Sequence, residues 1–197
     1  KGKKINFALN IPSASPYVLA HETAHGMCLP DLYSYGGAKG MKNPTGPWDL
    51  MAAASKAGGF LGWHRHKLKW LDAKRKTYVV KGKHRFELTP LNAPSGVSMI
   101  TVPVNDPANP SKVFVVEIAQ PIRNLGKVGS VTGVLVYSVD ATLATGLNAV
   151  VVYPKIDLLH ASFEPGDLFE HKEAPLSVKV LKKNGNGSYL IELDVPS

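Results

Sequence analysis

The residues of this chain that could do chemistry lie together in the segment HETAH, residues 21–25. His21 and His25 are four residues apart, and on a helix this spacing puts both imidazoles on one face, with Cβ atoms about 5–6 Å apart. Both rings can then bind one metal ion, as in zinc hydrolases with the pattern HExxH. Glu22 lies beside the first histidine, where it can take a proton from a zinc-bound water while zinc polarises the scissile carbonyl. The alternative interpretation is an exposed helical turn with two unrelated histidines.

A catalytic zinc ion needs a third protein ligand and an open fourth position. Asp31 follows His25 by six residues. Because Pro30 ends the preceding helix, the chain can turn back there and bring the Asp31 carboxylate to the metal. We therefore predict that Asp31 is the third ligand.

Two further residues are candidates for the same site. Met51 closes the segment Trp48-Asp49-Leu50-Met51 and could form an apolar floor beneath the zinc ion, although a single methionine more often fills a core. Cys28 lies seven residues after His21, on the same helix face if the helix extends that far. Its thiolate is an alternative ligand to Asp31, and a buried, inert cysteine is the plainer interpretation.

The elements that position these residues can be predicted from caps and breakers. Ser13 and Ser15 are candidate N-caps and Pro16 suits a first helical position, so a helix is expected to begin there and to end before Pro30. Residues 31–59 are rich in Gly, Pro, Asn and Ser, which is typical of a long ordered loop that serves a site. Before the helix, a short strand is expected at 5–9.

A second helix is predicted at residues 60–71, with one apolar side and one side rich in Lys, Arg and His. His64 and His66 belong to the polar side, where they are expected to be solvated surface residues. Either could stabilise an oxyanion if this helix borders the cleft, and the same role is open to Tyr33 and Tyr35 from the loop.

After residue 76 the pattern changes to short β-like runs separated by turn residues, which predicts a β-sandwich-like C-terminal part. Asn184-Gly185-Asn186-Gly187 is a strong hairpin signal. Glu117 in the run VFVVEIA could be buried with a partner or have an alternative metal role, although a strand residue that faces solvent is the plainer interpretation. The predicted strands are 77–80, 85–88, 98–102, 113–118, 133–139, 149–153, 176–181 and 189–195.

Three stretches of the chain resemble secreted zinc metallopeptidases of the immune inhibitor A-like family, which belongs to the metzincin-like group. They are HETAHGMCLPDLY at 21–33, GPWDLM at 46–51 and FLGWHRHKLKWLD at 60–72, and weaker similarity continues through VFVVEIAQPIRN and GVLVYSVDA. The resemblance implies an α+β fold: residues 1–76 form the zinc-binding part of the catalytic domain, and residues 77–197 form an antiparallel β-rich accessory domain. It also implies secretion and synthesis as a zymogen.

By the same resemblance His21, His25 and Asp31 are zinc ligands, Glu22 is the general base and Met51 is the methionine turn. This sequence departs from the family in having Cys28 where a glycine usually lets the chain turn. It also departs in having only 20 residues before His21, where the family has a sheet. We therefore expect an N-terminal segment of the same precursor to be a partner.

Composition narrows the remaining function classes. The net charge is +8, but the chain has no arginine-rich run with interleaved aromatics, so nucleic acid is not an expected partner. No stretch approaches the roughly 18 apolar residues of a membrane-spanning helix. Calcium is a further candidate cofactor through Asp106, Asp140 or Asp157, although none belongs to a recognisable calcium loop.

Two functions from different classes follow. The first is a zinc-dependent endopeptidase that acts on proteins or peptides. The second is a non-catalytic, degenerate peptidase fragment that acts as a binding module. The intact HExxH segment favours the first, whereas Cys28 and the short segment before His21 favour the second.

Overall fold

The computed structural model of the chain describes residues 15–36, 42–104, 106–120, 132–171 and 174–196. The strand expected at 5–9 and the candidate cap Ser13 lie outside these residues. The elements within them are α1 (Pro16–Gly26), η2 (Gly46–Trp48), α2 (Gly62–Lys67), η3 (Ala73–Arg75), β1 (Lys76–Tyr78), β2 (Gly82–Leu88), β3 (Met99–Pro103), β4 (Lys112–Ile118), β5 (Val134–Asp140), β6 (Val150–Val152), β7 (Leu168–Glu170), β8 (Ser177–Lys183) and β9 (Tyr189–Val195).

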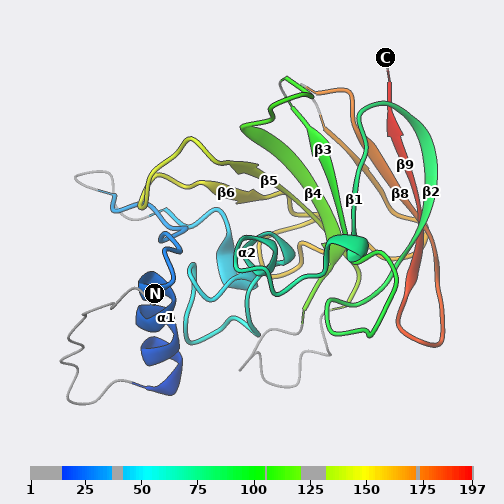
Figure 1. The fold of residues 1–197 in the computed structure, drawn as a ribbon. Coiled ribbons are helices and arrows are strands. Elements are labelled where there is room, and N and C mark those ends of the chain that lie inside the picture. The colour runs from blue at the N-terminus through cyan, green and yellow to red at the C-terminus, as the bar shows by residue number, and fades with distance from the viewer. Residues whose placement is uncertain (1–14, 37–41, 105, 121–131, 172–173, 197) are drawn as a thin grey trace.

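The strands form two sheets, and the fold is α+β as the sequence predicts (Figure 1). The central sheet has the strand order β1-β3-β4-β5-β6, in which β1 pairs with β3 in parallel and the other pairs are antiparallel. The outer sheet has the order β2-β9-β8-β7 and is antiparallel. This arrangement is compatible with the predicted β-sandwich-like part.

The central sheet is buried on both faces. Along β4, Phe114 and Val116 belong to a cluster shared with the outer sheet, whereas Val113 and Val115 belong to a second cluster shared with residues before position 76. Successive side chains of a strand point to opposite faces, so one strand can serve both cores. This explains why VFVVEIA is an almost continuous apolar run instead of an alternating one.

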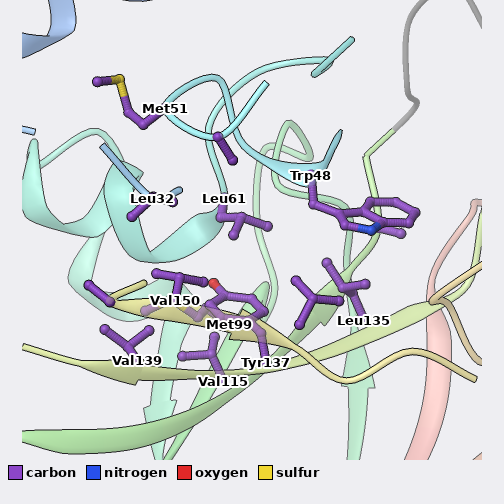
Figure 2. Close-up of a cluster of buried hydrophobic side chains, with 14 of the residues drawn as sticks. Leu32, Trp48, Met51, Leu61, Met99, Val115, Leu135, Tyr137, Val139 and Val150 are labelled. Atoms are coloured by element: carbon purple, nitrogen blue, oxygen red, sulfur yellow. The ribbon is translucent and has the colours of Figure 1, made fainter. Parts of the chain in front are cut away.

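The segment that carries the candidate site packs on one face of the central sheet. Figure 2 shows Leu32, Trp48 and Leu61 above the strand face that bears Val115 and Tyr137. All five side chains are almost fully buried. Burial of each large apolar side chain stabilises the fold by about 1.5–3 kcal/mol. The loop after α1 is therefore fixed by packing against strands that lie far away in the sequence.

Helix α1 begins where the sequence predicts. Ser15 is the N-cap, its hydroxyl accepts a hydrogen bond from the Val18 N–H at 3.4 Å, and Pro16 is the first helical residue. The helix ends at Gly26, before Pro30, and Cys28 then adopts φ +65°. A left-handed conformation costs a residue with a Cβ atom roughly 1–2 kcal/mol. The chain thus turns at Cys28 even though the residue is not glycine.

The predicted length of the second helix is wrong. Helix α2 has six residues, and its last turn closes with the Lys69 N–H on the His66 carbonyl at 3.0 Å and the Trp70 N–H on the Arg65 carbonyl at 2.8 Å. Lys69 adopts φ +61° at the position that glycine usually takes in this C-terminal motif. Trp70 therefore leaves the predicted apolar side and is 58% exposed.

The prediction that Glu117 faces solvent is wrong. Its side chain is fully buried because α2 and neighbouring residues cover the face of β4 that points away from the outer sheet. Its Oε2 atom accepts hydrogen bonds from the Gly62 N–H at 2.8 Å and from the Tyr137 hydroxyl at 2.8 Å. A Cβ atom at Gly62 would lie 2.4 Å from the same oxygen, so a larger residue there would displace the Glu117 carboxyl group from this hydrogen bond. Burial raises the pKa of Glu117 to about 8.

The hairpin prediction is confirmed, and one strand was missed. Strands β8 and β9 are antiparallel, and the Asn184 N–H donates to the Ser188 carbonyl across the turn, where Gly187 adopts φ +81°. Strand β7 has only three residues and gave no recognisable alternation.

No helix in the described part of the chain is long and apolar enough to cross a membrane.

The raised pKa of Glu117 predicts a pH-dependent stability. Between about pH 4.5 and 8 the folded protein keeps a proton that the unfolded chain has lost, so the free energy of unfolding falls as pH rises, by up to about 1.4 kcal/mol per pH unit. Glu117→Gln removes this titration and should flatten the profile between pH 5 and 8. Urea unfolding in the presence of a chelator measures it.

The exposed Glu170→Gln is the matched control for this experiment and should keep the wild-type slope. If the slopes of Glu117→Gln and the control are the same, Glu117 does not hold a proton in the folded protein.

Candidate metal centre

The structure brings His21, His25 and Asp31 together. The Nε2 atoms of the two histidines lie 3.0 Å and 3.3 Å from the same oxygen, Asp31 Oδ1. The two rings meet edge to face, with centroids 4.8 Å apart and planes at 89°. In the described part of the chain these three residues form the group with metal-ligand spacing, since one donor atom from each lies within 4.8 Å of the others.

Hydrogen bonds on the far side of each ring decide which nitrogen faces the carboxylate as an acceptor. His21 Nδ1 lies 2.9 Å from the Leu50 carbonyl, and His25 Nδ1 lies 2.8 Å from the Leu29 carbonyl. A carbonyl only accepts, so Nδ1 carries the proton in both rings, and in the neutral imidazole Nε2 is left with a lone pair. Histidines that bind metal are held in the same way.

Three acceptor atoms therefore converge, which is the arrangement that a metal ion requires. Asp31 Oδ1 is buried and has no hydrogen-bond partner, and a buried acceptor without a partner is costly. A divalent cation shared by the carboxylate and the two Nε2 lone pairs satisfies all three atoms. Ligand atoms about 2.0–2.2 Å from a tetrahedral zinc ion lie roughly 3.3–3.5 Å apart. The N···O distances of 3.0 and 3.3 Å are close to this spacing.

The turn that contains Met51 supports the first histidine. The Leu50 carbonyl accepts the His21 hydrogen bond, and the Met51 carbonyl accepts the Leu32 N–H at 3.1 Å. Met51 itself is fully buried in the cluster below α1. The backbone of this turn thus bonds two parts of the site. The Leu50 carbonyl bonds His21 on α1, and the Met51 carbonyl bonds Leu32, the residue after Asp31.

A buried aspartate fixes this turn to α2, and it corrects the prediction for His64. Asp49 Oδ1 accepts from the Met51 N–H at 2.8 Å, and Oδ2 accepts from the Leu61 N–H at 2.8 Å. His64 Nδ1 lies 3.0 Å from Asp49 Oδ2, and His64 is only 3% exposed. The prediction of a solvated His64 is wrong because Asp49 provides the partner that lets a polar ring be buried. His66 is half-buried beside Lys76.

Asp31 is held by Tyr35, which lies four residues further along the chain, and by Thr145, which lies far away in the sequence. The Tyr35 hydroxyl donates to Asp31 Oδ2 at 2.7 Å, and Thr145 Oγ1 accepts from the Asp31 N–H at 2.9 Å. The sequence suggested Tyr35 as an oxyanion donor, and its contact with the carboxylate was not foreseen. Thr145 gave no signal, because it is 114 residues away and belongs to no motif.

Glu22 is half-buried on α1, next to His21. The Tyr33 ring stacks on His21 with centroids 6.5 Å apart. Burial raises the pKa of the Tyr33 phenol to about 12, with a smaller contribution from Asp31 and a slight one from the nearby Glu22 carboxylate. Tyr33 is therefore a neutral hydrogen-bond donor at neutral pH.

Two alternative metal assignments receive no geometric support. Cys28 is exposed, so its interpretation as a buried cysteine is wrong. It also does not belong to the three-residue group, although it lines an open depression with His25 and Asp31. Of the calcium candidates, Asp140 contacts Lys112 at 2.9 Å and Asp157 contacts His160 at 3.0 Å. Neither forms a group with metal-ligand spacing in the described residues.

Searches of known protein families, of curated proteins and of solved structures found no match to this chain.

Asp31→Asn should separate metal binding from folding. The new amide can donate to the histidine lone pairs, so without metal the variant should be at least as stable as wild type. Zinc at about a hundredfold excess over its Kd should stabilise wild type by about 2.7 kcal/mol and the variant by far less. Thermal unfolding with zinc and with a chelator measures both effects.

Asp106→Asn is the matched control, because this exposed side chain bonds only locally, to the Ala108 N–H, within the described residues. Equal stabilisation of Asp31→Asn and the control by zinc would mean that Asp31 is not a ligand.

Proposed function

We propose that this chain is a zinc-dependent endopeptidase of the metzincin-like type. The observation that carries the proposal is the convergence of two imidazole lone pairs and a buried carboxylate oxygen without a hydrogen-bond donor. This donor set, two nitrogens and one oxygen, is among those that catalytic zinc sites use, and it leaves a fourth position for water or substrate.

Zinc in this position supplies a Lewis acid that polarises a peptide carbonyl and lowers the pKa of water. The protein contributes the three ligands and the hydrogen bonds that orient them. His21 and His25 are oriented through Nδ1 by backbone carbonyls, and Asp31 through Oδ2 by Tyr35. Each ligand therefore offers one defined atom to the metal.

Glu22 is the general base of the proposed reaction. It follows His21 on α1, so its carboxylate extends from the same turn that carries the first ligand. Its role is to accept a proton from the attacking water and to deliver that proton to the leaving amine. The neutral Tyr33 phenol, whose ring stacks on His21, is a candidate donor to the developing oxyanion.

A peptide can reach the site from the side of His25. The His25 side chain is 33% exposed, whereas that of Asp31 is 8% exposed. An open depression at this side is lined by His25, Cys28, Pro30 and Tyr35, together with neighbouring residues. Membership of the immune inhibitor A-like family, secretion and zymogen processing remain parts of the proposal that rest on the resemblance of the motifs.

The proposal is tested by measuring the zinc content of the purified chain together with hydrolysis of casein or a quenched peptide. We expect one zinc per chain and activity that chelation removes and zinc restores. Bound zinc without hydrolysis would favour the non-catalytic binding module. Absence of zinc at micromolar free concentrations would contradict the proposed metal site.

Glu22→Gln should abolish most of the turnover and leave zinc bound, because it removes the base without removing a ligand. The expected loss in kcat is about 10²–10⁴-fold. Peptide hydrolysis and metal analysis of the same sample measure the two effects. The Glu170→Gln variant, at an exposed position outside the site, should keep wild-type activity. Near-normal turnover of zinc-loaded Glu22→Gln would exclude Glu22 as the base.

A further inference from the structure

We propose that Thr145, in the connection between β5 and β6, is a positioning residue for the third zinc ligand, and that it acts through Tyr35. The inference rests on the proposed zinc site and adds a part of the chain that no motif assigns to it. The connection between β5 and β6 lies more than a hundred residues from the HExxH segment.

The side chains of Thr145 and Tyr35 form a closed cycle of hydrogen bonds with Asp31. The Asp31 N–H donates to Thr145 Oγ1 at 2.9 Å, and the single proton of the Tyr35 hydroxyl goes to Asp31 Oδ2 at 2.7 Å. Tyr35 Oη and Thr145 Oγ1 lie 3.0 Å apart, so the Thr145 hydroxyl must be the donor in this contact. All three bonds then run in one direction around the cycle and strengthen one another.

The backbone of the β5–β6 connection pairs with the same segment. The Tyr35 N–H donates to the Gly146 carbonyl at 3.3 Å, and the Gly146 N–H donates to the Asp31 carbonyl at 3.4 Å. Gly146 adopts φ +74°, and a Cβ atom there would lie 2.4 Å from the Tyr35 ring. The ring therefore lies against bare backbone, and this close approach holds the Tyr35 hydroxyl at the carboxylate.

The cycle uses Asp31 Oδ2 and leaves Oδ1 directed at the two histidines. Oδ1 has no hydrogen-bond donor, so the cycle selects which carboxylate oxygen is offered to a metal. Hydrogen bonds of this kind to a ligating carboxylate typically change metal affinity 10–100-fold. Without the Thr145 hydroxyl, the Asp31 N–H and Tyr35 Oη both lose a partner, and the Tyr35 hydroxyl that holds Asp31 Oδ2 is less firmly oriented.

Thr145 and Tyr35 are poor candidates for a purely structural role. Thr145 is an exposed residue and Tyr35 is 60% exposed, so neither contributes much to the core. Their polar atoms instead meet at the one buried carboxylate of the metal centre. We therefore expect their removal to change zinc affinity much more than it changes the stability of the metal-free protein.

Thr145→Val tests the proposal, because it keeps the shape of the side chain and removes the hydroxyl. Zinc affinity should fall about tenfold, measured by competition with a chromophoric chelator. The visible spectrum of the cobalt-substituted protein should change because the carboxylate is less firmly held. Thr145→Ser restores the hydroxyl and should recover affinity to within about twofold.

Thr142→Val is the matched control. Thr142 lies in the same connection, and its side chain bonds Asp140 and not the metal centre. The zinc affinity of the Thr142→Val variant should equal that of wild type. Tyr35→Phe interrupts the cycle at another point and should weaken zinc binding to the same extent as Thr145→Val. If one of these two variants folds poorly, the other still tests the proposal.

The outcomes separate this inference from the proposed function. If wild type binds no zinc, the proposed site is wrong. If wild type binds zinc and both Thr145→Val and Tyr35→Phe bind it as tightly as Thr142→Val does, the site stands and the positioning role of Thr145 is wrong. A drop in affinity that Thr145→Ser does not restore would also overturn the role of the hydroxyl.

Discussion

Asp31 Oδ1 is buried, carries negative charge and faces two nitrogen lone pairs, and no donor in the described residues contacts it. Such an arrangement repels itself unless a positive charge, a metal ion or a proton on one of the rings, is shared among the three atoms. The surrounding hydrogen bonds fix which atoms face one another. Leu50 and Leu29 hold the protons of both rings on the far side, and Tyr35 occupies the other carboxylate oxygen. The three candidate ligand atoms are therefore held in place by their neighbours.

Preorganisation of this kind requires a rigid support, and the central sheet provides it. One face of this sheet packs on the outer sheet, and the other packs on the loop that follows α1 (Figure 1). Two buried acidic side chains fix the loop further. Asp49 joins the Met51 turn to α2 through His64, and Glu117 joins α2 to the central sheet through Gly62. The positions of His21 and Asp31 thus depend on strands that contribute no ligand.

The β-rich part also reaches the site directly, through Thr145 and Gly146. Interactions made by exposed residues contribute little to stability, so their value lies in orientation. The connection between β5 and β6 also borders the open depression at His25, through Thr145.

The sequence by itself determined the local features of this protein. The cap at Ser15, the spacing of His21 and His25 and the hairpin at 184–187 depend on neighbours in the chain, and short-range rules suffice for them. The burial of His64 and Glu117 and the contact of Thr145 with Asp31 were decided by the tertiary structure. Each depends on a partner that is not a neighbour in the sequence: Asp49 for His64, Tyr137 for Glu117, and Asp31 for Thr145. Sequence patterns predict that a polar residue is exposed, because burial requires a hydrogen-bond partner. Only the folded chain brings such a partner to the residue.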